Sequence, residues 1–271
     1  MVTKDLAFVL KRYNFRETSV IASFYTQKFG KITGILKGFY TQKKEFASHL
    51  DKLSLNEIVF YPKKSDVWLI SFADLVYDYG FLRSDLSRAS VASIFLNLID
   101  KTMQPLDKNL EVFELLRDSL FSLKEETARK TLYVFLIKFL TLSGFKPEFG
   151  KCLICHKQAN DETLFSVSRG GLVCKECGLE PAGRRPAPTF VTGVASPAES
   201  GQDIQAKGAK DQDTRKVGAD TIASLFYIQN NDFPLALRIK PTAECEKEMV
   251  YLLREFLCCH LDIDISKHRL Q

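Results

Sequence analysis

Long hydrophobic runs are absent from this sequence of 271 residues. A membrane-spanning helix needs about 20 consecutive apolar residues, and the densest apolar stretch, residues 132–142, is interrupted by Lys138. The N-terminal apolar patch, residues 6–10, is too short for a secretory signal and leads directly into Lys11 and Arg12. We therefore expect a soluble cytoplasmic protein that does not associate with membranes.

Histidine is also scarce, with four residues in the chain. No His-x-Glu motif of the kind that zinc deaminases use is present, and no Ser-His-Asp or Cys-His set can be argued. Gly30, Gly34 and Gly38 recur every four residues, but no Gly-Lys-Ser or Gly-Lys-Thr follows, as a nucleotide-binding P-loop requires. We therefore predict no enzymatic activity and no catalytic residues.

Neither sign of charge dominates, because the formal net charge is only +5. Apolar residues make up 45% and charged residues 26%, an ordinary globular composition that excludes a wholly disordered chain. The length suggests about two domains. Glycine and proline gather in residues 181–220, where large apolar residues are scarce. We interpret residues 181–220 as a flexible, largely disordered linker.

Residues 1–82 have the pattern of a small β domain. Short runs rich in β-branched and aromatic residues recur and are separated by turn signals, at residues 6–11, 19–26, 31–37, 56–61 and 67–79. Five short strands with a longer connection after the third favour a closed barrel such as the OB-fold. Some other small antiparallel domain is the alternative.

Helical periodicity dominates residues 83–150 and returns in residues 221–271. The helix expected over residues 126–143 is apolar around most of its circumference, so we place it at the centre of a bundle. The last helix has too much apolar surface to stand alone, and we expect it to pack on the earlier helices. The fold class is therefore α+β: an N-terminal OB-fold β-barrel, then an α-helical bundle domain, with a four-cysteine zinc ribbon at residues 151–180 inserted before the final helices.

The cysteines supply the most specific motif. Two Cys-x-x-Cys pairs, Cys152/Cys155 and Cys174/Cys177, are separated by 18 residues, within the range typical of a four-cysteine zinc site. The segment between them can form a hairpin that turns at residues 170–171. Four thiolates leave no open coordination position, so we predict one structural Zn²⁺ rather than a catalytic one. The other three cysteines, near the C-terminus, receive no chemical role.

Basic residues concentrate at the N-terminus. The first 50 residues carry a net charge of +6, so the remaining residues sum to −1. Amines on a β-barrel can track phosphates while nearby aromatic rings stack on bases, which suits single-stranded nucleic acid. If about 4–5 phosphates are contacted, the logarithm of the affinity should fall with the logarithm of salt by roughly 3–3.5. The candidate DNA-binding residues are Lys11, Arg12, Arg16, Lys28, Lys31, Lys37, Lys43 and Lys44.

The order of these parts resembles the bacterial RecO family of recombination mediators. Local motifs are similar to that family as well: Val-Leu-Lys at 9–11, Tyr-Asn-Phe-Arg-Glu at 13–17, Phe-Tyr-Thr at 24–26, Leu-Lys-Gly at 36–38, Phe-Leu-Arg-Ser-Asp-Leu at 81–86 and Gly-Phe-x-Pro at 144–147. The resemblance covers nearly all of the chain except residues 181–220. Each motif is loose, and it is their common order that is specific.

The resemblance implies binding of single-stranded and double-stranded DNA, and annealing of complementary strands coated by single-strand-binding protein. It implies partnership with RecR in loading RecA, at the bacterial nucleoid, and leaves open whether RecF takes part. The family also docks the acidic, Phe-ending tail of single-strand-binding protein on its helical domain. Lys138 resembles a basic position of that site, and Arg129 and Lys130 are weaker candidates.

Two other functions stay open at this point. In the first, the ribbon and the helices form a protein-interaction scaffold, and the charge of the barrel only aids solubility. Intact partner binding without DNA affinity would select that function. In the second, the protein is a zinc enzyme, which would require an open coordination position on the metal.

Overall fold

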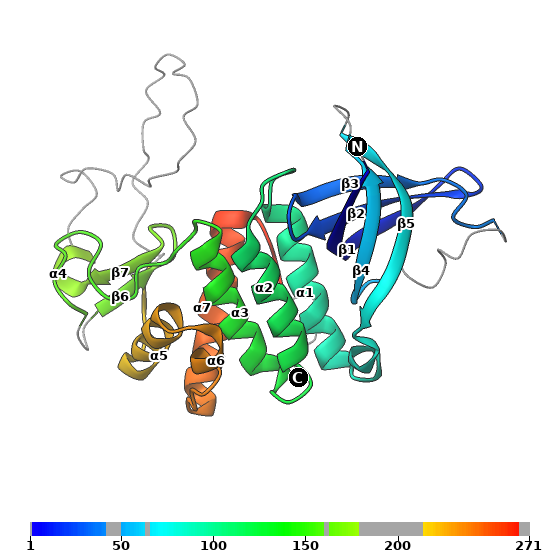
Figure 1. Ribbon diagram of the computed structural model, residues 1–271. Helices are drawn as coiled ribbons and strands as arrows, with labels where there is room; N and C mark the ends of the chain where they lie inside the picture. The colour runs from blue at the N-terminus through cyan, green and yellow to red at the C-terminus, as the bar shows by residue number, and fades with distance from the viewer. Residues whose placement is uncertain (1, 42–49, 63–65, 160–162, 179–213, 266–271) are drawn as a thin grey trace, which may run out of the picture. The chain divides into compact units, whose positions relative to one another are not determined.

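The computed structural model describes residues 2–41, 50–62, 66–159, 163–178 and 214–265 (Figure 1). It divides into two compact units, Met1–Phe139 together with the C-terminal residues from Ile265, and Leu140–Asp264. The first unit holds the barrel and the helices that follow it. The second holds both cysteine pairs and the last helices. No helix among the described residues is long and apolar enough to cross a membrane.

The first unit begins with a closed barrel whose strands follow the order β1-β2-β3-β5-β4. Neighbouring strands are antiparallel except for β3 and β5, which pair in parallel over a short stretch. This arrangement confirms the predicted OB-like barrel. The strands are β1 (Thr3–Phe15), β2 (Ser19–Thr26), β3 (Gly30–Leu36), β4 (Ser54–Tyr61) and β5 (Val67–Asp78).

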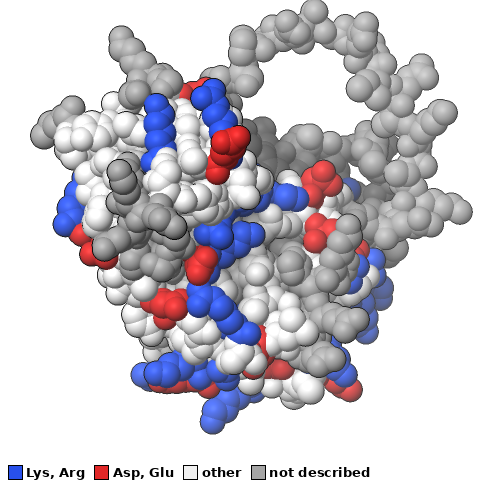
Figure 2. Space-filling model, turned by 90° about the vertical axis from the view of Figure 1, so that its right-hand side faces the viewer, with Lys and Arg blue, Asp and Glu red and all other residues white. Residues whose placement is uncertain are grey.

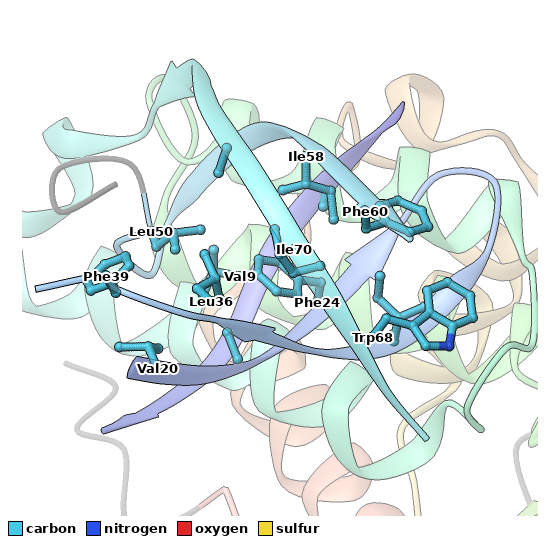
Figure 3. Packing of buried hydrophobic residues seen from close by; sticks show 14 residues of the cluster. Val9, Val20, Phe24, Leu36, Phe39, Leu50, Ile58, Phe60, Trp68 and Ile70 are labelled. Carbon is cyan, nitrogen blue, oxygen red and sulfur yellow. The ribbon is translucent and has the colours of Figure 1, made fainter. Parts of the chain in front are cut away.

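Alternating apolar residues of these strands fill the barrel interior (Figure 3). Phe39 and Leu50 lie at one end of this core cluster, and Phe60 and Trp68 lie at the other. The rings of Phe60 and Trp68 stack with centroids 5.3 Å apart. Full burial of one such aromatic side chain contributes about 1.5–3 kcal/mol relative to leaving it exposed. The barrel is therefore stabilised by its own apolar core.

Three helices follow the barrel after a short 3₁₀ turn, Gly80–Ser84. Asp85 and Asn109 cap two of these helices, because their side chains accept hydrogen bonds from the backbone N–H groups of Arg88 and Val112. The third helix is buried along nearly its whole length, as its apolar circumference predicts. The helices are α1 (Leu86–Thr102), α2 (Leu110–Ser122) and α3 (Ala128–Leu142).

The barrel is joined closely to α1 and α2. The Phe113 ring on α2 lies 5.2 Å from Phe8 and 6.4 Å from Tyr25. At the β2–β3 turn, Gly30 has a φ of +67°, and a Cβ there would lie 2.0 Å from the Asp107 carbonyl oxygen. Only glycine permits both this backbone conformation and this close approach. These contacts, which no sequence pattern indicated, join the predicted domain 1–82 to the helices after it.

In the second unit, a hairpin carries the second cysteine pair. Its turn ends at Gly170, whose φ is +72°, close to the predicted turn at residues 170–171. Residues 179–213 lie outside the described part of the chain. One short helix, α4, precedes them, and a short strand and three helices come after them. The elements are β6 (Thr163–Ser166), β7 (Gly171–Cys174), α4 (Lys175–Gly178), β8 (Thr214–Lys216), α5 (Ala219–Asn230), α6 (Phe233–Ala236) and α7 (Ala243–Leu261).

The C-terminal end of the predicted linker 181–220 was wrong. Thr214–Lys216 form β8, which pairs with the edge of β6, and α5 begins at Ala219. The free backbone groups at an edge strand attract such a short strand despite its polar sequence. The grouping of residues 83–150 with 221–271 in one domain, and the packing of the last helix on the earlier ones, stay predictions.

Candidate metal centre and nucleic-acid interface

The four predicted ligands come together at one point. The sulfur atoms of Cys152, Cys155, Cys174 and Cys177 all lie within 4.8 Å of one another. A tetrahedral zinc ion with Zn–S bonds of about 2.3 Å places its sulfurs about 3.8 Å apart. The Sγ atoms of Cys155 and Cys174 are 3.7 Å apart. The donor set and its spacing therefore fit zinc.

Backbone N–H groups prepare Cys152 to act as a thiolate. Burial acts to raise its pKa, but backbone N–H groups of Cys155, Cys174 and Ile154 outweigh burial and lower the pKa to about 6. The donors on Cys174 and Ile154 lie 3.3 and 3.4 Å from the Cys152 sulfur. The thiolate is the form that binds a metal ion. By contrast, burial and the neighbouring sulfurs raise the pKa of Cys177 to about 12.

The turn after the first pair resembles a metal-binding knuckle. His156 has a φ of 59°, in the left-handed region, and its N–H donates to the Cys152 carbonyl at 3.0 Å. Its side chain is exposed, as expected of a solvated neighbour rather than a ligand. The turn of the hairpin is also attached to α7, because His260 Nε2 donates a hydrogen bond to the Val167 carbonyl at 2.7 Å.

The predicted DNA-binding residues do not lie on one surface. Residues paired across two strands share a side of the sheet. Arg12 pairs with Ala22, whose side chain belongs to the barrel core, whereas Lys11 pairs with Ser23 on the outside. Neighbouring basic residues of β1 therefore point to opposite sides. Figure 2 shows lysine and arginine side chains in separate groups, with acidic and uncharged surface between them.

One group surrounds the β1–β2 turn, and we call it the hairpin end: Arg12, Tyr13, Phe15, Arg16, Lys37 and Tyr40. The backbone N–H of Tyr40 donates to the Thr18 carbonyl at 3.2 Å and thereby joins the segment after β3 to this turn. The Tyr40 hydroxyl also donates to Asn14 Oδ1 at 2.6 Å, which fixes the direction of its ring.

Two cations of the hairpin end, Arg12 and Arg16, make only weak contacts. The Arg12 guanidinium lies 6.0 Å from the centre of the Phe39 ring and 3.6 Å from the Asp51 carboxylate. Arg16 has a φ of 56° and lies 5.2 Å from the Phe15 ring. Exposed ion pairs of this kind contribute little, so a phosphate can replace the carboxylate.

A second pair of cations meets a single carboxylate on α1, and we call this the Asp100 group: Lys11, Lys31 and Asp100. Both ammonium groups contact Asp100 Oδ atoms, with Lys31 at 3.4 Å. Burial acts to raise the pKa of Asp100, but the two lysines outweigh it and lower the pKa. The hydrogen bond to Asp100 correspondingly raises the pKa of Lys11. Sequence reasoning missed Asp100, although a charge four residues after the buried Leu96 was the available signal.

The remaining predicted contacts fall elsewhere. Lys28 lies in the β2–β3 turn, at the opposite end of β2 from Arg16, which is about 25 Å away along an eight-residue strand. Lys43 and Lys44 lie outside the described residues. Lys138, predicted to bind a partner, is half-buried on α3. Arg129 and Lys130 are in the first turn of that helix, where Lys130 is paired with Glu126 at 3.0 Å.

Comparison with known proteins places the whole arrangement in one family. Family models described as recombination protein O, N terminal and C terminal, match residues 1–79 and 83–190. The DNA repair protein RecO of Syntrophus aciditrophicus is 31% identical over 212 residues, which cover 76% of this chain and 81% of that protein. The DNA repair protein RecO of Chlorobium phaeobacteroides is 26% identical over 264 residues, covering 96% and 93%. Five strands closed into an OB-like barrel, a four-cysteine cluster and these matches agree: the chain belongs to the RecO family and has a role in DNA repair and recombination.

Proposed function

We propose that this protein is a recombination mediator without catalytic turnover. It binds single-stranded and double-stranded DNA, anneals complementary strands, and with RecR helps to load RecA on DNA coated by single-strand-binding protein, at the nucleoid. The observation that carries the proposal is the hairpin end, where Arg12, Arg16 and Lys37 lie beside exposed aromatic rings.

The hairpin end has the chemistry that single strands require. The exposed fractions of Tyr13, Tyr40 and Phe15 are 58%, 46% and 36%, so all three rings present part of their surface to solvent at one end of the barrel. A flexible strand can lay its unpaired bases on such rings while its phosphates meet the cations. Bases in a duplex are already stacked, so the rings favour single strands, whereas the cations also serve duplex DNA.

Annealing follows from the same surface. Two complementary strands repel each other through their phosphates, and this repulsion weakens when cations of the protein neutralise part of the charge. Contacts to phosphates and ring faces carry no sequence preference, so the surface accepts any pair of strands. The protein thus needs to hold one strand loosely enough for a second to pair with it.

The ribbon has a structural part in this proposal. Bound to Cys152, Cys155, Cys174 and Cys177, zinc supplies folding free energy and no reaction step. The tail of single-strand-binding protein is proposed to contact Lys138, with Arg129 and Lys130 as weaker candidates, because an acidic tail needs cations beside apolar surface. A Lys138→Glu variant should then bind an acidic, Phe-ending peptide less tightly than the unchanged protein does.

Fluorescence anisotropy with labelled single-stranded DNA across a salt series tests the DNA-binding proposal. Three cations at the hairpin end predict a salt slope of about 2, smaller than the sequence alone suggested. Replacing Arg16 and Lys37 by serine should lower the slope by about 1.4. The matched control replaces two exposed lysines, Lys101 on α1 and Lys124 in the turn after α2, with the same loss of charge.

Two outcomes would contradict the proposal. Absence of binding at low salt would select the protein-interaction scaffold instead. Equal slopes for the hairpin-end variant and its control would show that binding follows overall charge and not this surface. A parallel assay of annealing between two complementary strands should show the same order of variants.

A further inference from the structure

The carboxylate of Asp100 has no role in the proposed function described above. Its side chain is only 9% exposed, and it projects from α1 toward the outer side of the barrel. There it contacts the ammonium groups of Lys11 and Lys31, and it accepts a hydrogen bond from the Ser23 hydroxyl at 3.2 Å. Lys31 also donates to the Asp100 backbone carbonyl.

The two lysines lie on the same side of the barrel as the exposed rings. Lys11, Tyr13 and Phe15 alternate along β1 and share its outer side, and Lys31 lies on the outer side of β3. Lys11 remains 37% exposed and Lys31 20%. A strand that lies on the rings and continues toward α1 would therefore reach these lysines, but it would also meet the carboxylate between them.

We propose that Asp100 limits the affinity of the barrel for DNA by holding Lys11 and Lys31 away from phosphates. This proposal rests on the proposed function, because it concerns the same nucleic-acid surface. A phosphate near Lys11 is repelled by the Asp100 charge, and any contact requires an ammonium group to leave a mostly buried partner. Two of the basic residues on the barrel therefore add little to binding.

A moderate affinity suits annealing. A strand held by every cation of the barrel would leave slowly, and the paired product would not be released. When Lys11 and Lys31 stay paired with Asp100, the binding of DNA depends on the cations and rings of the hairpin end. Asp100 is thus a positioning residue, since it acts on DNA through the lysines and does not touch the strand.

A salt series on single-stranded DNA separates this role from simple fastening of α1 to the barrel. Asp100→Asn should increase the salt slope by about 0.7 for each lysine released. At 0.1 M salt this is an affinity gain of roughly 5-fold for one lysine and 25-fold for both. Asp74→Asn is the matched control, because Asp74 is exposed on β5 and its replacement changes the net charge equally.

Two further variants sharpen the test, and the first of them does not depend on how well Asp100→Asn folds. Lys11→Met alone should leave the slope unchanged, and in the Asp100→Asn background it should remove the share of the gain that Lys11 contributes, about 0.7 in the slope. A slope that falls by about 0.7 in Lys11→Met alone would overturn the proposal, because Lys11 would then already contact phosphate. Equal slopes for folded Asp100→Asn and Asp74→Asn would also overturn it. If the unchanged protein fails to bind DNA, the proposed function itself fails.

Discussion

The barrel and the cysteine ribbon are both small β structures, yet different interactions stabilise them. The barrel buries a cluster of apolar side chains contributed by β1–β5 and by Phe39 and Leu50 between β3 and β4. The ribbon has two strands of four residues each, and its sulfur atoms are its most specific feature. A segment this short cannot bury a sufficient core and needs a staple. In the barrel, stability comes from the interior, so the exposed side chains of its hairpin end are available for the proposed contacts to nucleic acid.

Removal of the metal should have the largest effect and should separate the two regions. Binding of a structural zinc ion contributes about 10–16 kcal/mol of apparent folding free energy in small zinc domains at neutral pH. A strong chelator should therefore release one zinc per chain and abolish protection of the β6–β7 amides from hydrogen exchange. Amides of β1–β5 should keep their protection.

Cysteine variants sharpen this comparison. Cys174→Ser should lose zinc, whereas Cys245→Ser, a buried cysteine on α7, should retain it. Zinc content is measured by a colorimetric assay after denaturation. Retention of zinc by Cys174→Ser would contradict the four-cysteine site.

Truncation of the barrel core should have the converse effect. Phe24 is fully buried, and Phe24→Ala should cost about 3–5 kcal/mol of unfolding free energy, since it removes apolar contacts and leaves a cavity. Urea unfolding followed on the barrel measures the loss. Val76→Ala, at a position that is 51% exposed, should change stability by about 0.5 kcal/mol or less. Loss of zinc from Phe24→Ala would indicate that the two regions do not fold separately.

The exposed rings should matter for single strands. Stacking on one aromatic side chain contributes about 1–3 kcal/mol per base, so Tyr13→Ala should weaken single-strand binding by about 5- to 150-fold. Duplex affinity should change much less. Tyr251→Ala is the control, because Tyr251 is a similarly exposed ring on α7 in the second unit. Equal losses for both variants, measured by anisotropy, would assign binding to both units.

The ion pair at Asp100 should give the smallest effect, visible in the pH dependence of barrel stability. Because the pKa of Asp100 is lower in the folded protein than in the unfolded chain, its ionised carboxylate stabilises the fold above about pH 4. This stabilisation is lost as the pH falls through the pKa of the folded state. Asp100→Asn should cost about 1–2 kcal/mol at pH 7. The difference from the unchanged protein should vanish in acid. A difference that persists at low pH would assign the cost to packing.

Features set by local pattern were predictable from the sequence. The run of β-branched and aromatic residues at 19–26 predicted β2 with the same bounds as in the structure, and the cysteine spacing predicted the sulfur cluster. Both depend on residues that are close in the chain or on a fixed ligand geometry, so no knowledge of distant contacts is needed.

Features set by distant contacts were not predictable. Lys11 and Arg12 are adjacent and chemically alike, but one meets Asp100, far along the chain, and the other meets Asp51. Under the proposal for Asp100, fewer cations are available for DNA than the number of basic residues suggests. The strand β8 was missed for the same reason, because its polar residues become a strand only beside β6.

The most direct test of the central claim is ultraviolet cross-linking of a short oligothymidylate to the full chain. The linked peptides are then identified by mass spectrometry. The claim is that the barrel binds DNA at its hairpin end, while the ribbon is a structural element held by zinc. Cross-links at Tyr13, Phe15 and Tyr40 are the predicted result. Cross-links confined to residues 140–264 would contradict the account, because the strand would then lie on the unit that holds the ribbon.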